Sequence, residues 1–494
     1  MGTDGFEGGT VLRREFTFWS SFAISFAFIS PIVALYSIFG LAISTAGPPF
    51  WWGFVIVFAG QLLVALVFAM LVSKWPYEGS IYQWSRRLVG PRYGWFAGWT
   101  YQCSLIIGMT TLALATAGFT ANVVGVEHPS GATTAWIALL ILIAGTALNM
   151  TGRRVLSVFV SASIVAEVIG SVGLAIWLLL FHRVQPLSVL VDGQPAGSGD
   201  YLSIHGPFLI ALIFIGFSFV GFESAGAIAE EVHEPDKSLP KAIIRSLTLI
   251  AVVVMFSSLA IILAIPDMRS VTDGDVADPV YYTLTNQLGE GIARPLELLF
   301  AIGFMASFLA VQTSASRMIW SFARDNALPG SRILVILSRK QRQPVNALML
   351  TTAIGAALLL LSNFASNIYS LMVNFTAGSF FLSFLFPLVG ALVVQVRRQW
   401  CAGRFSLGRG TLLITVAAVM WTALELINIA WPRKSHPETY LDWSVLIGVV
   451  FLAGLGIAVF AIARPPLETR EDPVQPPTVA SNDNSVVNAE KGDQ

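Results

Sequence analysis

The stretch FSFVGFESAGAIAEEVHEPDKSLPK, residues 217–241, decides how the rest of the chain can fold. It begins in an apolar segment long enough to cross a bilayer, yet carries Gly221, Gly226 and Glu223 near the middle of that segment. A glutamate at membrane depth costs about 2.5–3.5 kcal/mol on insertion scales, so such a residue indicates a function by default. The stretch therefore predicts a membrane helix that is interrupted around Glu223.

The composition is that of an integral membrane protein. Hydrophobic residues make up 55% of the 494 positions and charged residues only 12%, whereas soluble domains have about 25% charged residues. The 29 basic residues balance the 29 acidic ones, and no basic surface interleaved with aromatic residues is evident, so we expect no nucleic-acid partner. The two cysteines and five histidines are scattered along the chain. The sequence therefore predicts no disulfide framework, no metal site and no cofactor.

Twelve apolar segments are long enough to cross about 30 Å of hydrocarbon. They cover residues 18–43, 51–72, 94–123, 133–150, 155–181, 206–232, 242–265, 293–323, 345–362, 367–396, 410–431 and 442–463. The first run is too long for a signal peptide, so we expect residues 1–17 to be a cytoplasmic segment before an uncleaved helix. Residues 464–494 are rich in Pro, Asp and Asn, which predicts a disordered cytoplasmic tail.

The distribution of Lys and Arg indicates the orientation, because positively charged loops stay in the cytoplasm. With twelve spans and the N-terminus inside, the basic residues outside would be only Arg183, Arg269, Arg294, Arg433 and Lys434. We therefore expect a multi-pass protein of the plasma membrane with both termini in the cytoplasm.

Two of the apolar segments are interrupted. The first contains Ile29-Ser30-Pro31, where proline removes a backbone donor and clashes with the preceding turn. The sixth contains the glycines around Glu223. Each interrupted segment opens a set of five, and paired interruptions in two halves are typical of inverted-repeat transporters. A break in either segment alone is equally compatible with helix packing.

Three separated motifs carry a resemblance to a known family. They are KWPYEGSIYQWSRRL (residues 74–88), GFESAGAIAEEVHEPDKSLPKAI (residues 221–243) and SFARDNALPGSRIL (residues 321–334). They are similar to the second-to-third loop, the sixth helix and the end of the eighth helix of the amino acid/polyamine/organocation permeases. The chain most resembles the amino acid/choline branch of that superfamily.

The resemblance implies both a fold and an activity. The implied fold is an all-α membrane protein of about 12 helices, with a LeuT-type inverted repeat at about 18–181 and 206–396 and two extra helices at 410–463. The implied activity is secondary transport of an amino acid or a related amine, such as GABA or choline, by alternating access with proton coupling or exchange. The partners are then the small substrate and the lipid bilayer, and the sequence carries no signal for an oligomeric state.

A helix break exposes unpaired N–H groups at the start of its second half and unpaired C=O groups at the end of its first half. We expect a substrate carboxylate near Ile32-Val33 or Ser224-Ala225, and a substrate ammonium near the carbonyl ends. Phe217 stands one turn before Gly221, where the similar segment of the arginine/agmatine antiporter has an aromatic gate, although a packing role is equally compatible. The candidate substrate-binding residues are Ile29, Ser30, Pro31, Ile32, Val33, Phe217, Gly221, Phe222, Glu223, Ser224 and Ala225.

Glu223 and Glu167 are the candidate coupling residues. Burial favours the uncharged form of a carboxyl group, so protonation could accompany substrate movement. Either glutamate could instead have a structural, hydrogen-bonding role. Sodium coupling would require paired hydroxyl groups on the eighth span, for which the candidates are Ser307, Thr313, Ser314 and Ser316.

Charged residues at the cytoplasmic ends of the sixth and eighth spans are candidates for an inner gate. We expect Glu230 to pair with Arg324, with Glu231, Glu234 and Arg317 as further candidates; a solvated helix end is the alternative. Glu425 on the eleventh span is expected to be structural.

Other functions that remain open are a nucleobase permease of the same fold, a nutrient receptor that does not transport, and a channel. An enzyme is the least expected, because no catalytic set of residues gathers in the spans.

Overall fold

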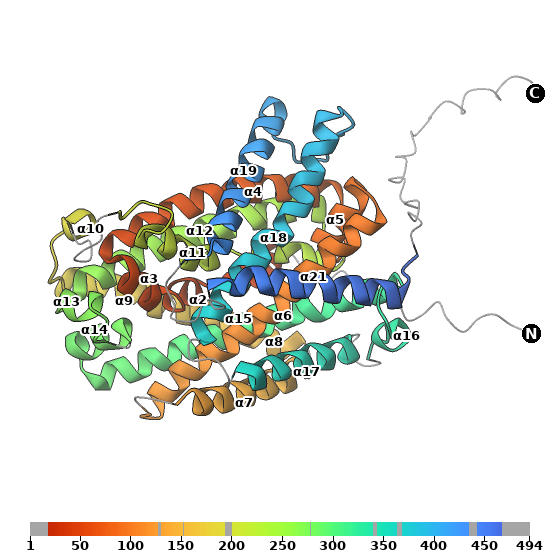
Figure 1. Cartoon of the computed structure of the whole chain (residues 1–494). Coiled ribbons are helices and arrows are strands. Elements are labelled where there is room, and N and C mark those ends of the chain that lie inside the picture. Colours follow the sequence, from red (N-terminus) through yellow and green to blue (C-terminus); the bar gives the residue numbers. More distant parts are fainter. Residues whose placement is uncertain are drawn as a thin grey trace, which may run out of the picture.

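A computed structural model describes residues 18–126, 130–151, 153–192, 200–276, 278–338, 343–362, 368–433 and 442–466. The expected cytoplasmic segment 1–17 and nearly all of the expected tail lie outside the described residues. Every regular element in the described part of the chain is a helix, as the composition predicts (Figure 1).

The described chain contains eleven helical segments that are long and apolar enough to cross a membrane, and one shorter apolar helix. This confirms the all-α fold with about twelve membrane helices. The spans are, in order, α1 (Phe18–Ile29) with α2 (Pro31–Tyr36) and α3 (Phe39–Ala46); α4 (Trp51–Lys74); α6 (Pro91–Val123); α7 (Gly131–Met150); α8 (Arg153–Glu167) with a π-helical turn (Val168–Gly173) and α9 (Leu174–Phe181); α11 (Pro207–Ser218) with a 3-10 segment (Phe222–Glu231); α12 (Pro235–Ala264); α15 (Glu290–Arg324); α17 (Val345–Ser362); α18 (Ile368–Val396); α19 (Thr411–Ala430); and α21 (Ser444–Ala463).

Short helices in the connections gather at the two ends of the bundle. The connections after the fifth and seventh spans carry α10 (Val189–Asp192), α13 (Met268–Thr272) and α14 (Pro279–Leu288), which lie at the left in Figure 1. The connections after the second and eighth spans carry α5 (Ile81–Leu88) and α16 (Ser331–Leu334), which lie at the right, near the end of α21. These two connections after odd spans thus lie at the opposite end from these two after even spans. We call these ends the α14 end and the α5 end.

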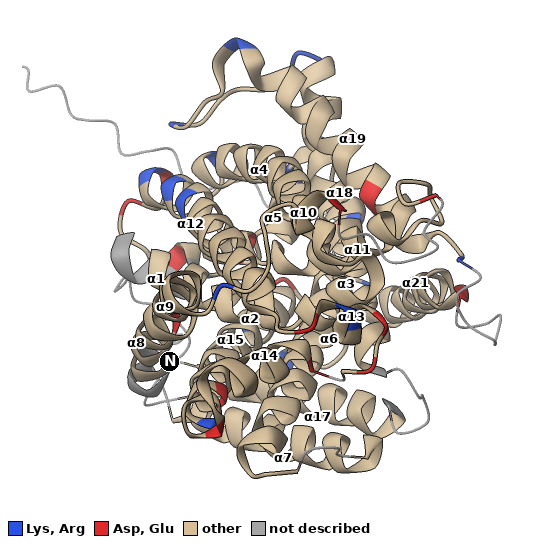
Figure 2. Cartoon of the chain, turned by 90° about the vertical axis from the view of Figure 1, so that its left-hand side faces the viewer, with Lys and Arg blue, Asp and Glu red and all other residues tan. Residues whose placement is uncertain are grey.

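The two interrupted spans are the most deeply buried. In the apolar windows of the first and sixth spans 89% of the residues are buried, compared with 11% in α21. Around them α6 packs most extensively against α15 and α18, and α12 against α4. Seen from the α14 end, most Lys, Arg, Asp and Glu residues lie on connections and helix ends (Figure 2). The interrupted spans therefore lie at the centre of the bundle and α21 at its periphery.

A buried hydrogen-bond network holds α7, α15 and α17 together. Gln312 donates from Nε2 to Thr146 (2.7 Å) and Thr352 (3.2 Å), and accepts at Oε1 from Asn149 (3.2 Å). Thr313 donates to Oδ1 of Asn149 (3.1 Å). Such contacts between membrane helices contribute roughly 0.6 kcal/mol each, so together they favour a rigid arrangement of these three helices.

Candidate functional site

The break expected at Ser30-Pro31 is present in the structure. α1 ends at Ile29 and α2 begins at Pro31, while Ser30 between them has a positive φ of 49°. Oγ of Ser30 accepts a hydrogen bond from the amide of Val33 (3.2 Å). Proline suits the first position of a helix because its missing N–H would have no partner there. The sequence Ser-Pro thus ends one helix and begins the next without a loop.

Glu167, at the end of α8, lies against this break. Its carboxylate accepts hydrogen bonds from the hydroxyl of Ser30, from the amide of Ile32 (2.9 Å) and from the hydroxyl of Ser171 (3.4 Å). The π-helical turn that follows Glu167 is a feature found frequently at functional sites. The amides of Ile32 and Val33, which the sequence suggests for a substrate carboxylate, therefore already have acceptors within the chain.

The break in the sixth span is built differently. α11 ends at Ser218, Gly221 has φ 100°, and the chain continues as a 3-10 segment. A Cβ atom at Gly221 would lie 2.4 Å from the ring of Phe28, so both the backbone conformation and the packing require glycine. At Gly226 a Cβ atom would lie 2.9 Å from the Cβ of Ser80, which brings the segment close to α5.

Glu223 is fully buried within the sixth-span break. One carboxylate oxygen accepts from the amide of Gly221 (3.1 Å), and the other accepts from the phenol of Tyr101 on α6 (3.1 Å). The amide of Ser224 donates to the carbonyl of Gly221 (3.0 Å), whereas its buried hydroxyl has no hydrogen-bond partner in the described part of the chain. The hydroxyl of Ser224 is thus a buried polar group of this break without an internal partner among the described residues.

Side-chain hydroxyl groups join the two breaks to each other and to α15. Ser218 donates to the carbonyl of Ala34 in α2, and Ser307 donates to the carbonyl of Phe28 in α1 (2.6 Å). Ser307 thereby reaches the first helix as sodium coupling would require. Thr313 instead contacts Asn149, and Ser316 donates to the carbonyl of Thr313 (2.8 Å). No group of three or more His, Cys, Asp or Glu side chains that could hold a metal ion occurs among the described residues.

A cavity of about 30 Å³ lies between the two breaks. A water molecule needs roughly 10–15 Å³ of such volume, so the cavity has room for about two waters and not for an amino acid. Five spans line it, with Phe28, Ile29 and Val33 from the first, Gly108 and Leu112 from α6, Phe217 and Val220 from the sixth, Ser307 and Val311 from α15, and Thr376 and Phe380 from α18. The structure thus holds this site closed.

The sequence-based candidates divide into two groups in the structure. Ile29, Val33 and Phe217 line the cavity. The others are buried at the breaks without lining it. Among them, Phe222 packs against Phe68 and Phe384, with ring centroids 5.9 and 5.5 Å away. Ile32 packs against Gly303 and Gly170. The other buried candidates are Ser30, Pro31, Gly221, Glu223, Ser224 and Ala225.

Sequence reasoning missed the contributions of α6 and α18. Gly108 gives the cavity its room on one side, because a Cβ atom there would lie 3.3 Å from Cγ2 of Thr376. Tyr101 supplies a hydrogen bond to Glu223. The signal that could have indicated Tyr101 is a phenol in an apolar span, since a buried tyrosine hydroxyl usually finds a partner.

A larger pocket of about 520 Å³ lies toward the α14 end. Tyr36, Phe119, Asn122, Asp278 and Tyr369 are among its lining residues, and Tyr369 donates to the carbonyl of Ser37 (2.8 Å). Val33 lines the small cavity and Tyr36 this pocket, so only about one turn of helix separates the two.

A pair of carboxylates that sequence reasoning missed lies beside this pocket. Asn122 donates from its single side-chain amide to Asp278 (3.4 Å) and Glu297 (3.3 Å). Asp278 also caps α14 by accepting from the amides of Val280 and Tyr281 (3.0 Å each). Burial raises the pKa of Asp278 above its usual value.

Two ion pairs lie toward the α5 end, where α15 ends. Arg324 pairs with Glu230, as the sequence predicts, with an N–O distance of 3.1 Å. A second pair joins Arg86 to Asp325 (2.6 Å), and the hydroxyl of Tyr82 donates to the same aspartate (2.8 Å). Of the other gate candidates, Glu234 pairs with Lys237, and the side chain of Glu231 lies outside the described residues.

Glu425 lies away from the cavity, near the C-terminal end of α19. It accepts a hydrogen bond from Asn428 (3.0 Å), whose amide also donates to the carbonyl of Leu209 (3.0 Å). Arg433 donates to the carbonyl of Asn428 (2.7 Å). These contacts fasten α19 to the start of the sixth span, which fits the expected structural role.

Comparisons with known proteins point to one family. The family model described as amino acid permease matches residues 16–455. An uncharacterised amino-acid permease of Schizosaccharomyces pombe is 26% identical over 477 residues, which cover 91% of this chain and 83% of that protein. The amino-acid permease BAT1 homolog of Oryza sativa is 24% identical, covering 89% of both chains. A choline transporter of Saccharomyces cerevisiae is 23% identical, covering 86% of this chain and 77% of that protein.

Proposed function

Because the chain belongs to the amino acid permease family, we propose that it moves an amino acid or a related amine across the plasma membrane by alternating access. The observation that carries this proposal is the closed cavity between two broken helices. It lies between an ion-paired layer at one end of the bundle and a pocket at the other. Opening of such a closed site to one end at a time is what alternating access requires, which supports the proposal.

In the proposed cycle, the two sets of five helices at about 18–181 and 206–396 act as inverted repeats, and the helices at 410–463 stand outside them. Both termini lie in the cytoplasm, so the α5 end is the inner side. The pairs Glu230–Arg324 and Arg86–Asp325 form the inner gate and are closed in this state. Only about one turn of helix separates the cavity from the outer pocket, so we infer that the outer side opens first.

The ligand chemistry follows from which backbone groups are free. The amides after Ser30 are occupied by Glu167 and by Ser30 itself, and Glu223 accepts from the amide of Gly221. We propose that the substrate ammonium meets the carbonyl ends of the two broken helices, which carry about half a negative charge each. The hydroxyl of Ser224 then serves a carboxylate or hydroxyl of the substrate. Both zwitterionic amino acids and amines without a carboxylate fit this arrangement.

We propose proton coupling or exchange through Glu167 and Glu223. Each carboxylate accepts hydrogen bonds from a break and from a second helix or turn. A protonated carboxyl group has one acceptor oxygen fewer for these donors. Protonation would therefore loosen the breaks at the step where the helices must move.

Transport by the purified full chain in liposomes tests the proposal. We expect labelled substrate to enter faster when the lumen holds the same unlabelled substrate, for at least one member of a panel of amino acids, GABA, choline and nucleobases. Val33→Trp, which fills the cavity, should abolish this counterflow, whereas Val450→Trp on the exposed face of α21 should retain it.

Three outcomes would contradict the proposal. Absence of counterflow for the whole panel, with folding verified, would remove the transporter class. Binding without counterflow would indicate a receptor. Unitary currents would indicate a channel. Counterflow of nucleobases alone would keep the mechanism and change the substrate.

A further inference from the structure

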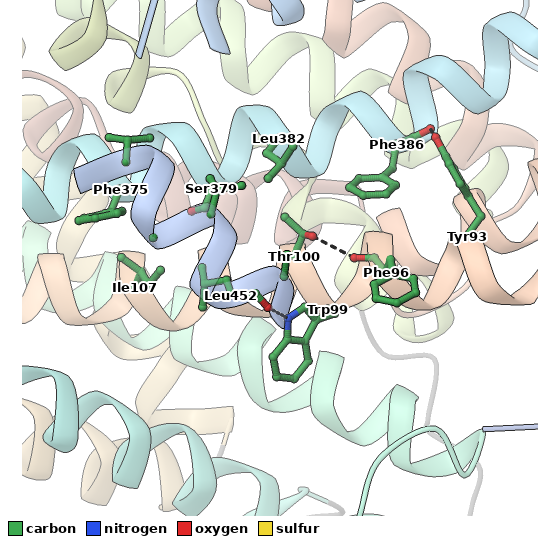
Figure 3. A pocket seen from close by; sticks show the side chains of 14 residues that line it. Tyr93, Phe96, Trp99, Thr100, Ile107, Phe375, Ser379, Leu382, Phe386 and Leu452 are labelled. Carbon is green, nitrogen blue, oxygen red and sulfur yellow. Dashed lines mark hydrogen bonds between the residues drawn. The ribbon is translucent and has the colours of Figure 1, made fainter. Parts of the chain in front are cut away.

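A cavity of about 320 Å³ lies between α6, α18 and α21 (Figure 3). Its lining includes Phe96 and Ile107 from α6, Phe375 and Phe386 from α18, and Leu452 from α21. Only 11% of the apolar window of α21 is buried, and the side chains of Phe96, Phe386 and Leu452 are half-buried. The cavity therefore lies at the lipid-facing side of the bundle, where a molecule from the hydrocarbon layer can reach it.

The polar side chains of this lining are already paired within the protein. Each of them donates to a backbone carbonyl of its own or a neighbouring helix, namely Tyr93 (2.8 Å), Trp99 (2.9 Å), Thr100 (2.9 Å) and Ser379 (3.0 Å). Figure 3 shows three of these bonds, with Tyr93, Trp99 and Thr100 as the donors. The described residues of the lining include no Lys, Arg, Asp or Glu. The interior of the cavity thus suits a hydrocarbon chain.

Two arginines lie beyond the cavity at the α5 end, where α6 begins and α21 ends. The two helices meet there through the rings of Phe96 and Phe460, which stack with centroids 5.5 Å apart. Arg92 precedes Phe96 by one helical turn, and Arg464 follows Phe460 by one turn. Both arginine side chains are exposed. Two positive charges therefore flank the α5 end of the cavity, at the level where α21 leaves the hydrocarbon layer.

Neither of these arginines has a partner within the described part of the chain, whether for a hydrogen bond, an ion pair or a ring contact. Arg86 on the neighbouring α5 instead pairs with Asp325 (2.6 Å). Like charges on adjacent helices repel each other, so an anion shared between them is favoured. The planar guanidinium group matches the oxygens of a phosphate group.

We propose that this site binds an anionic phospholipid, with one acyl chain in the cavity and the phosphate group between Arg92 and Arg464. The phosphate stays at the surface of the hydrocarbon layer, so it is not desolvated in the cavity. A zwitterionic lipid fits less well, because its own cationic group is repelled by the two arginines. In the orientation proposed above, the α5 end faces the cytoplasmic leaflet, which carries the anionic lipids.

α6 and α18 separate this cavity from the closed cavity between the two breaks. Ile107 and Phe375 line the outer cavity, whereas their neighbours Gly108 and Thr376 line the closed one. An acyl chain in the outer cavity fills the space directly behind this wall and adds contacts that stabilise the packing of α6 against α18. Any effect on transport rests on the proposed function, whereas binding of the lipid does not.

Photolabelling tests the site without a transport measurement. The full chain in phosphatidylcholine nanodiscs is irradiated with a trace of phosphatidylglycerol or phosphatidylcholine that carries a diazirine on one acyl chain. Each arginine beside an anionic lipid should contribute roughly fivefold, so phosphatidylglycerol should label peptides of α6, α18 and α21 about 25-fold more than phosphatidylcholine does. The melting temperature should also be higher in phosphatidylglycerol nanodiscs, because a bound ligand stabilises the folded state. Soluble glycerol phosphate should not compete, because it lacks the chain.

Charge variants separate this site from general attraction to the cytoplasmic surface. Arg92→Gln and Arg464→Gln should each lower labelling by phosphatidylglycerol about fivefold, and together they should reduce it to the level of phosphatidylcholine. The control is the double variant Arg397→Gln and Arg409→Gln, which removes the same charge from exposed arginines at the connection between α18 and α19. It should leave the labelling unchanged.

A second pair of variants tests the cavity itself. Val449→Trp fills it and should abolish the labelling, whereas Val450→Trp places the same ring on the exposed face of α21 and should retain it. Equal labelling by the two lipids, or an equal loss in both double charge variants, would show only general attraction and would overturn the proposal. Competition by glycerol phosphate would indicate a site for a free anion and would also overturn it.

Discussion

The two helix breaks differ in where their carboxylate comes from. At the first break Glu167 reaches in from α8 and accepts from Ser30 and Ile32. At the sixth break Glu223 belongs to the break itself and accepts from Gly221 two residues earlier. The carboxylate at the first break therefore comes from a neighbouring span, and the carboxylate at the sixth break comes from the same span.

This difference separates two kinds of motion. Loss of the Glu167 contacts removes the hydrogen bonds that join the first break to α8, so we expect it to change the relative position of two spans. Loss of the Glu223 contacts changes the local path of the sixth span and removes its hydrogen bond to α6 through Tyr101. We infer that Glu167 controls a movement between helices and that Glu223 controls the shape of the site.

The largest expected effect comes from Gly221→Ala. The left-handed conformation costs a residue with a Cβ atom roughly 1–2 kcal/mol. The clash with Phe28, at 2.4 Å in the present packing, adds roughly 1–3 kcal/mol. We expect the ratio of folded to unfolded protein to fall more than tenfold, since 1.4 kcal/mol corresponds to tenfold, with a lower melting temperature and a loss of counterflow. Gly454→Ala in α21 is the control, because no atom lies within 4 Å of its added Cβ. Equal stability of the two variants would mean that the sixth break does not depend on its glycine.

Removing the two glutamates one at a time tests the comparison directly. Glu167→Ala leaves the buried amide of Ile32 and the hydroxyl of Ser30 without their acceptor, at a cost of about 1–3 kcal/mol. Glu167→Gln retains one acceptor oxygen and should lose less stability. We expect labels on α2 and α8 to move apart in Glu167→Ala and to keep their separation in Glu223→Gln, as measured by electron spin resonance. Separation in both variants would abolish the distinction between the breaks.

The proposed coupling role of Glu223 is tested by the pH profile of counterflow. Glu223→Gln should flatten this profile, because the side chain no longer exchanges a proton. Tyr101→Phe removes a donor to the same carboxylate without removing the proton site, so it should shift the profile and not flatten it. An active Glu223→Gln protein with an unchanged profile would assign the residue a structural role.

A smaller effect is expected at the inner gate. Glu230 and Arg324 are 27% and 24% exposed, and such pairs contribute roughly 0–1 kcal/mol, or up to about fivefold in the population of a state. Glu230→Gln should favour opening at the α5 end and increase the modification of cysteines introduced beside the gate. Arg294→Gln, which breaks the exposed pair with Glu290 at the other end of α15, is the control. An equal increase in both variants would remove the gate from the mechanism.

The features that were predictable from the sequence are those that local chemistry decides. Pro31 and Gly221 disturb the helix at their own positions, and the number of spans follows from the length of the apolar runs. The lining of the cavity by Gly108 and Thr376 was not predictable, because these residues are far apart in the chain and neither disturbs its own helix. The position of Glu167 is intermediate. A buried carboxylate needs donors, but the sequence does not say that they are the amides of the first break.

The smallest expected effect concerns Asp278, which lies outside both breaks. Its contribution to any measured pH dependence must be separated from the contributions of Glu167 and Glu223. Burial raises its pKa, so the folded protein binds this proton more tightly than the unfolded chain does. The stability that Asp278 contributes is therefore full below its usual value of about 3.9 and is lost as the pH rises through the raised pKa. Asp278→Asn retains a good cap for α14 and removes the titration, so the free energy of unfolding should depend less on pH above that value.

Asp267 provides a matched control of opposite sign. It caps α13 in an exposed position, and hydrogen bonds from the hydroxyl of Ser270 and the amide of Arg269 lower its pKa. Its contribution to stability is present at neutral pH and is lost only as the pH falls through the lowered pKa. Asp267→Asn should therefore flatten the acid side of the unfolding profile, and Asp278→Asn the side above it. If both variants changed the same side of the profile, burial would not be the cause of the raised pKa of Asp278. The pH dependence of stability that remains after the contributions of Asp267 and Asp278 are subtracted could then not be attributed to Glu167 and Glu223.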